Sequence, residues 1–330
     1  MQLPQDIKHL AILLPSWVGD VVMASCVWKM ARKKYPNATI TAVIRPHLAP
    51  ILDGIDDFDH VLSLDMKTSV LKAAKKLKQI HADAIILLPN SFRSAAIARL
   101  ANIHYRCGYA RNHRSWLLSN RVAVEQQNEP TPTSNYYLHL ANTTFGMHES
   151  NAIPSIVTDD TEKTILDDFS KPIVLLVAGA SKPEKRWSPI GFAKVADALS
   201  ELGVTCCAIG SPKEHELVQT IVAAATSQVH DLTRSGVTLG SLKSIVSQAD
   251  LMITNDTGPR HLAVACGTPT ITLYGPTDYR WTKYECNHDI ALLADPFLPE
   301  NAIADSNPKR CNINNIPASD VIAISKRFIL

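Results

Sequence analysis

The sequence predicts an α/β protein that consists of two doubly wound domains in tandem. With 330 residues, the chain is longer than a single hydrophobic core usually supports. Short apolar runs of strand length alternate with stretches of helical periodicity, and this alternation occurs twice, on either side of an irregular stretch. Strands joined by helical crossovers pair in parallel, so each half predicts its own parallel sheet.

The first domain is predicted to span residues 1–160. Its strands are expected at 10–14, 40–44, 60–64 and 84–88, and its helices near 21–34, 67–80, 93–101 and 135–145. A stretch rich in glutamine and proline, 125–133, interrupts the alternation before the last of these helices.

The second domain is predicted to span residues 161–316. Strands are expected at 173–177, 204–209, 251–254 and 270–273, with helices near 189–201, 213–225, 240–248 and 259–266. The C-terminal segment 317–330 has a helical pattern, and we expect it to pack back on the first domain.

Because ligands of doubly wound sheets bind at the carboxyl ends of the strands, two such domains predict a ligand cleft between them.

The composition excludes several classes of protein. Hydrophobic residues make up 46% of the chain and charged residues 19%, which is typical of globular proteins and not of disordered or collagen-like chains. The N-terminal apolar run 10–14 is too short for the core of a signal peptide or for a membrane span, so we expect a cytoplasmic protein. Seven scattered cysteines do not suggest a disulfide framework, and Cys286, His288 and Cys311 lack the paired spacing of a zinc site.

The charge of the chain is small overall but unevenly distributed. A net charge of +2 argues against a strongly basic nucleic-acid-binding protein. Between Asp83 and Glu125, however, there is no acidic residue, while six arginines occur: Arg93, Arg99, Arg106, Arg111, Arg114 and Arg121. This stretch favours an anionic ligand on the first domain, although each arginine alone could equally belong to a solvated face.

The loop after the first strand holds a candidate general base. Asp20 stands at a helix start, directly after the sequence Trp17-Val18-Gly19. It could simply cap the helix, which is worth about 1 kcal/mol. Its place at the carboxyl end of a strand, however, would let it reach a substrate hydroxyl. The loop lacks the GxGxxG pattern, which argues against a dinucleotide cofactor and a hydride-transferring dehydrogenase.

Three loops of the second domain are typical of a phosphate and nucleotide site. Asp256, Thr257 and Gly258 follow a strand and open a helix, whose free N–H groups and positive dipole end attract a diphosphate. A helix start without any ligand is the alternative. The loop 179–187, with three basic residues, shifts the balance towards phosphate, and Glu214 or Glu216 in a further loop could accept ribose hydroxyls. Stabilisation by the helix dipole would explain either glutamate equally well.

With these loops identified, the chain resembles glycosyltransferase family 9, the ADP-heptose:lipopolysaccharide heptosyltransferases, over nearly its whole length. Five motifs carry the resemblance: WVGD at 17–20, LPNSFRS at 88–94, KRW at 185–187, NDTG at 255–258 with His261, and LYGPT at 273–277. The LPNSFRS motif is similar to that of the second-heptosyltransferase branch of the family.

The resemblance implies a GT-B fold, in which two Rossmann-like doubly wound domains face a central cleft, with an acceptor domain followed by a donor domain. It implies an inverting enzyme that transfers heptose from ADP-heptose to the inner core of lipopolysaccharide, with Asp20 as the catalytic base. The residues implied in donor binding are Lys185, Trp187, Glu214, Asp256, Thr257, Gly258 and His261. Those implied in acceptor binding are Trp17, Gly19, Asn90, Ser91, Arg93, Arg111 and Arg114.

We expect no obligatory metal or other cofactor, because cationic side chains and oriented amides can stabilise a departing diphosphate. The implied partners are ADP-heptose or a related nucleotide sugar and a lipid A core acceptor, with peripheral contact at the inner face of the inner membrane and no nucleic acid. Two alternatives stay open: a GT-B transferase or epimerase that acts on another nucleotide sugar, and a non-catalytic protein that binds nucleotide sugars.

Overall fold

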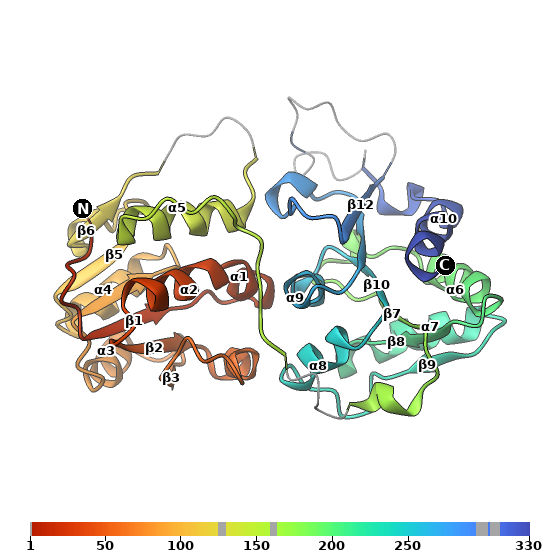
Figure 1. The fold of residues 1–330 in the computed structure, drawn as a ribbon, viewed down its shortest axis with the longest axis horizontal. Coiled ribbons are helices and arrows are strands. Elements are labelled where there is room, and N and C mark those ends of the chain that lie inside the picture. The colour runs from red at the N-terminus through yellow and green to blue at the C-terminus, as the bar shows by residue number, and fades with distance from the viewer. Residues whose placement is uncertain (1, 125–129, 159–163, 295–302, 304–310) are drawn as a thin grey trace. The chain divides into compact units, whose positions relative to one another are not determined.

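The structure, a computed structural model, describes residues 2–124, 130–158, 164–294, 303 and 311–330. It divides into two compact units, Met1–Pro154 and Ser155–Leu330, each with a six-stranded parallel sheet and covering helices (Figure 1). The predicted fold class, two doubly wound α/β domains, is therefore confirmed. The division falls after Pro154, a little before the boundary expected at residue 160.

The sheet of the first unit has the strand order β3-β2-β1-β4-β5-β6. Its strands are β1 (His9–Leu13), β2 (Thr39–Ile44), β3 (His60–Ser63), β4 (Ala84–Leu87), β5 (Tyr105–Tyr109) and β6 (Asn120–Val122). The central strands β1, β2 and β4 consist almost entirely of buried apolar residues. Strands of this composition are typical of a parallel sheet that helices cover on both faces.

The helices of the first unit pack in two pairs. Its helices are α1 (Val18–Met23), α2 (Ser25–Lys34), α3 (Val70–Lys78), α4 (Phe92–Leu100) and α5 (Thr133–Phe145). Helices α2 and α5 contact one another, as do α3 and α4. The second pair buries small residues such as Ala73, Ala95 and Ala98 against alternate side chains of β1 and β4. Small side chains let the helices approach the sheet closely.

The second unit repeats the topology of the first, with the order β12-β11-β10-β7-β8-β9. Its strands are β7 (Ile173–Val177), β8 (Thr205–Ala208), β9 (Val229–Asp231), β10 (Leu251–Asn255), β11 (Thr270–Tyr274) and β12 (Asp289–Leu293). Its helices are α6 (Pro189–Ser200), α7 (His215–Ala224), α8 (Ser241–Ser247), α9 (Gly258–Cys266) and α10 (Ala318–Ile329). Numbered within each unit, both sheets have the order 3-2-1-4-5-6, in which the direction of winding reverses between the first and fourth strands. These switch points lie between β1 and β4 and between β7 and β10.

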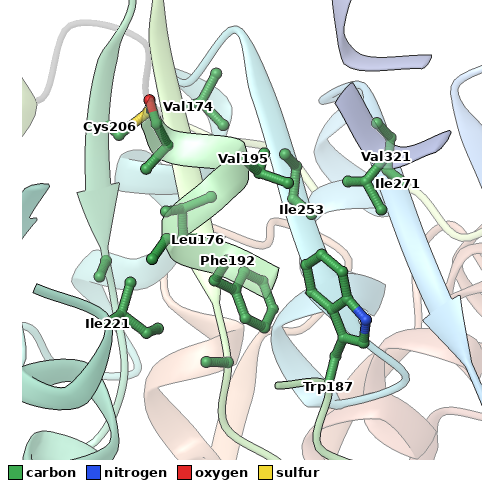
Figure 2. Packing of buried hydrophobic residues seen from close by; sticks show 14 of the residues in the cluster. Val174, Leu176, Trp187, Phe192, Val195, Cys206, Ile221, Ile253, Ile271 and Val321 are labelled. Carbon is green, nitrogen blue, oxygen red and sulfur yellow. The ribbon is translucent and has the colours of Figure 1, made fainter. Parts of the chain in front are cut away.

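The C-terminal helix takes part in the core of the second unit. Trp187 and Phe192 pack beside Ile253, and Val321 of α10 belongs to the same buried cluster (Figure 2). Helix α10 contacts α6, β10 and β11 of its own unit. Its apolar face thus helps to complete the core of the second unit, and packing of this helix on the first domain stays a prediction.

No helix among the described residues is both long enough and apolar enough to cross a membrane.

Candidate active site

Asp20 lies at the switch point of the first unit, in the first turn of α1. Trp17, and not Asp20, occupies the N-cap position, and it makes no side-chain capping bond. The interpretation of Asp20 as an N-cap is therefore wrong. Within the described part of the chain, the Asp20 carboxylate has no hydrogen-bond partner, and burial raises its pKa. A half-buried carboxylate without an internal partner is free to accept a proton from a substrate.

Helix α5 adds a group next to Asp20 that the sequence analysis did not find. Tyr137 is almost fully buried in α5, which contacts α1. Its pKa is raised well above the ordinary value, first by burial and then by the negative charge of Asp20. The phenol therefore stays neutral near the carboxylate. Nothing in the local sequence around residue 137 indicates this proximity, because the two residues are far apart in the chain.

Arg114 occupies a different place from the one expected for a ligand of the acceptor. Its side chain is fully buried, and burial lowers its pKa to about 10, which leaves it charged at neutral pH. The guanidinium donates to the carbonyl oxygens of Tyr109 (3.1 Å) and Pro89 and to Oδ1 of Asn90 (3.0 Å). Nδ2 of Asn90 in turn donates to the Tyr136 hydroxyl at 2.9 Å. Arg114 thus joins the loops that follow β4 and β5, and its role in acceptor binding stays a prediction.

The other predicted acceptor residues lie in the loops and first helical turns that follow β1, β4 and β5. Ser91 caps α4, since its Oγ accepts from the Ser94 amide at 3.1 Å. Arg93 donates to the carbonyls of Met66 (2.8 Å) and Thr68, so its guanidinium is already engaged. Trp17 and Arg111 are exposed, and Gly19 is buried. The structure therefore gathers these residues at one edge of the sheet. The guanidinium of Arg93, however, is hydrogen-bonded to backbone carbonyls of the same unit.

Asn255 connects the two loops at the switch point of the second unit. This fully buried side chain donates to the Ala178 carbonyl after β7 at 2.8 Å and accepts from the Trp187 amide at 3.1 Å. It thereby fixes the loop 178–187 beside the end of β10. Asn255 belongs to the NDTG motif, but it was not among the predicted site residues. Its position as the last residue of a buried strand was the available signal.

Glu214 extends over the same loop. One carboxylate oxygen accepts from the Ser211 amide (2.7 Å) and the Ser211 hydroxyl (2.8 Å) as part of a capping box. The other lies so close to Gly179 that a Cβ added there would come within 1.8 Å of it. Of the two glutamates considered, Glu214 is the one directed at the switch point, whereas Glu216 is exposed in the first turn of α7.

A buried cluster of charges lies beneath the start of α9. Oδ2 of Asp256 contacts Lys185 Nζ at 3.0 Å, and Oδ1 contacts Nη1 of Arg260 at 3.4 Å. Nη2 of Arg260 contacts Asp289 at 2.6 Å. Burial alone would raise the pKa of Asp256, but Lys185 and Arg260 lower it below its ordinary value. The cluster contains two cations and two carboxylates, so its formal charge is zero. Lys185 is the cation that the neighbouring loop contributes to it.

The start of α9 presents hydrogen-bond donors without internal partners. Thr257 is the N-cap residue, but its side chain makes no capping bond. Its buried Oγ1 has no hydrogen-bond partner among the described residues. The amides of the first helical turn are likewise not capped by this side chain, and the dipole of the helix makes this end positive. Together with Lys185 at the neighbouring loop, these groups can bind the oxygens of a diphosphate.

Two predicted donor residues are placed in the interior instead. Trp187 is 2% exposed, and its indole Nε1 donates to the Ile316 carbonyl at 3.0 Å. His261 is buried, with Nδ1 at 2.6 Å from the Tyr284 hydroxyl. Burial and then the charge of Arg260 lower the pKa of His261 to about 3, so its ring is neutral at physiological pH. Trp187 supports the loop from within the core, and His261 cannot supply positive charge to a phosphate.

The family model "Glycosyltransferase family 9 (heptosyltransferase)" matches residues 70–309. The chain belongs to glycosyltransferase family 9. A curated relative, lipopolysaccharide heptosyltransferase 2 of Salmonella typhimurium, is 27% identical over 83% of this chain and 84% of its own length. Two solved structures share the fold. The structure of E. coli ADP-heptose lipopolysaccharide heptosyltransferase II has a TM-score of 0.83 and 22% identity, and the match covers 97% of this chain and 98% of that one. A family 9 glycosyltransferase from Veillonella parvula has a TM-score of 0.85 and 21% identity, and the match covers 99% of each chain.

This family 9 protein is therefore a glycosyltransferase, and the expected GT-B type of fold, two Rossmann-like units in tandem, is confirmed. The family match covers parts of both units, including the switch-point loops 88–91, 178–187 and 255–258. In the described ranges, no three His, Cys, Asp or Glu side chains come together as metal ligands, so Cys286, His288 and Cys311 form no such group there.

Proposed function

We propose that this family 9 enzyme transfers heptose from ADP-heptose to the inner core of lipopolysaccharide, with inversion at the anomeric carbon. The observation that carries the proposal is the donor site of the second unit, where Asn255 holds the loop of Lys185 against the uncapped start of α9. Support for the sugar comes from the family description and from relatives named lipopolysaccharide heptosyltransferase 2.

In this proposal the second unit binds the nucleotide. The amides of Thr257 and Gly258 and the ammonium of Lys185 hold the diphosphate, while Asp256 orients Lys185 through their 3.0 Å contact. Glu214 accepts from the ribose hydroxyls, since its second carboxylate oxygen lies over Gly179 at the same switch point. These donors stabilise the negative charge that develops on the departing ADP.

The first unit supplies the base. Asp20 takes the proton of the acceptor hydroxyl as that oxygen attacks the anomeric carbon, and ADP leaves from the opposite face. Burial raises the pKa of Asp20, and a carboxylate with a raised pKa is a stronger base than an ordinary one. We assign the exposed Trp17 and Arg111 to binding of the acceptor. Asn90 would support these residues by fixing the loop after β4 through its hydrogen bonds to Arg114 and Tyr136.

We propose further that the reaction needs no metal ion and takes place at the cytoplasmic face of the membrane that holds the acceptor. The cationic and amide donors at the start of α9 can fulfil the electrostatic role of a metal. Transfer in the presence of a chelator at the same rate as in its absence is the expected result. A rate that falls with the chelator and recovers with added Mg²⁺ would reject this part of the proposal.

The choice of donor is tested by product analysis. The full-length enzyme is incubated with a lipid A core acceptor and either ADP-heptose or a set of UDP-sugars, and the nucleotide and the glycosylated acceptor are identified by mass spectrometry. We expect release of ADP together with an acceptor that has gained one heptose. Release of UDP and never of ADP would replace the proposal with transfer from another nucleotide sugar, and binding without any product would indicate a non-catalytic protein.

A further inference from the structure

Three large apolar side chains are exposed at the carboxyl edge of the sheet of the first unit. Leu71 is 71% exposed at the start of α3, Phe92 46% at the start of α4, and Trp116 68% in the loop after β5. The rings of Phe92 and Trp116 lie 5.9 Å apart. The starts of α3 and α4 are joined, because Arg93 donates to the carbonyls of Met66 and Thr68. We refer to Leu71, Phe92 and Trp116 as the apolar patch.

The apolar patch lies in the most basic part of the chain. Residues 66–124 contain eleven basic residues, five lysines and six arginines, against the single acidic residue Asp83, which gives a formal charge of +10. Since the whole chain carries +2, the remainder carries −8. Asp83 lies at the opposite edge of the sheet, where its carboxylate accepts from the Lys8 and His9 amides at 2.9 Å.

The lysines of this segment are placed beside the apolar patch. Lys67 lies in the turn before α3, and Lys72 and Lys75 lie on the same helix as Leu71. All three are exposed, and none of them forms an ion pair with another described residue. Ala73, Ala74 and Leu77 form the buried face of the same helix. The outer face of α3 thus combines cationic side chains with an exposed leucine.

Apolar side chains surrounded by lysines are the pattern of a surface that rests on a negatively charged bilayer, with the apolar groups among the acyl chains and the cations at the head groups. We propose that the apolar patch and the lysines of α3 dock the enzyme on an anionic lipid bilayer. The excess of positive charge favours an anionic bilayer over an apolar protein partner, because an apolar partner would not require positive charge around the patch. The apolar patch and Asp20 both lie at the carboxyl edge of the same sheet, so docking brings the base near the membrane surface. The benefit to catalysis rests on the proposed function, in which the acceptor is a lipid.

Vesicle sedimentation tests the docking surface directly. The full-length protein is mixed with vesicles of phosphatidylglycerol and phosphatidylethanolamine, or of phosphatidylcholine alone. We expect binding to the anionic vesicles, release by high salt and little binding to phosphatidylcholine. Leu71→Ser with Trp116→Ser, and separately Lys72→Glu with Lys75→Glu, should each lower the partition coefficient about tenfold or more. Ile190→Ser with Lys194→Glu, at exposed positions of α6, is the matched control and should bind like the wild type.

A second measurement separates this proposal from the proposed function. Transfer to a water-soluble core oligosaccharide without acyl chains should be the same for the wild type and for both pairs of variants, because none of the changed residues belongs to the site. Wild-type protein that ignores anionic vesicles, or variants that bind them normally, would overturn the docking proposal and leave the transferase proposal intact. Variants that lose transfer to the soluble acceptor, while their melting temperature is unchanged, would also overturn it, since the surface would then act in the reaction.

Discussion

Asp20 combines partial burial with the lack of a hydrogen-bond partner among the described residues, and this determines how the rate should depend on pH. Burial raises its pKa above the ordinary carboxyl value of 3.8. A general base acts only when ionised, so the rate is full above this pKa and falls as the pH drops through it.

The pH dependence of kcat/KM is therefore predicted to have an acid limb that lies above the ordinary carboxyl range. The measurement is a pH profile of heptose transfer, with circular dichroism at each pH to confirm that the protein stays folded. A rate that is constant down to the ordinary carboxyl range would show that the ionisation of Asp20 does not control the reaction.

Lys185 and Lys182 belong to one loop but differ in their contacts, which makes them a matched pair. Lys185 is bound to buried Asp256, whereas Lys182 is exposed. Lys185→Gln removes a charge-assisted contact to phosphate of about 1.5–3 kcal/mol and should weaken ADP binding about 10- to 100-fold. Lys182→Gln should leave the Kd nearly unchanged. Titration calorimetry with ADP measures both, and equal effects of the two changes would argue against a specific role for Lys185.

At the level of single residues, the sequence predicts which loops carry the candidate site more readily than it predicts the contacts of each side chain. Asp20, Lys185 and Glu214 could be found because each follows a predicted strand. The burial of Arg114, Trp187 and His261 could not be foreseen. Their partners, such as Asn90 for Arg114, Ile316 for Trp187 and Tyr284 for His261, are distant in the chain. A polar or aromatic residue in a motif has the same local pattern whether it contacts a ligand or supports a loop.

At the scale of secondary-structure elements, the junction of β7, β10 and α9 depends on Asn255. Asn255→Ala leaves the Ala178 carbonyl and the Trp187 amide without partners in a buried place. Each unsatisfied buried group costs about 1–3 kcal/mol, so we predict a loss of about 2–4 kcal/mol in the free energy of unfolding. Weaker binding of ADP should accompany it, because the Lys185 loop is no longer fixed.

Urea denaturation and calorimetry check this prediction, with Asn135→Ala, at an exposed position of α5, as the control. If Asn255→Ala retained both the stability and the ADP affinity of the wild type, Asn255 would not hold the two loops together.

The elements that the sequence predicted are those with continuous apolar runs or long helical periodicity. Eight strands were predicted in this way: β1, β2, β3, β4, β7, β8, β10 and β11. Strands β5, β6, β9 and β12 were not predicted: β5 contains Arg106 and Gly108 within its run, β6 and β9 have three residues each, and β12 is a half-buried edge strand. In such strands pairing with a neighbour, and not the local pattern, determines the structure. The predicted helix 21–34 is divided at Ala24 into α1 and α2.

At the scale of the whole molecule, one topology is used twice with different chemistry at the switch points. The first unit presents a carboxylate after β1, and the second presents amides and a lysine after β7 and β10. A doubly wound sheet brings the loops of its first and fourth strands together regardless of their sequence. The same fold can therefore serve two tasks.

The central claim is that Asp20 performs the proton transfer while the second unit holds the nucleotide. Its most direct test measures both the ADP affinity and the heptose transfer rate of Asp20→Asn in the full-length enzyme. The account predicts that the Kd for ADP stays within about twofold of the wild type, while the transfer rate falls about 100-fold or more. A transfer rate within a few-fold of the wild type would contradict it.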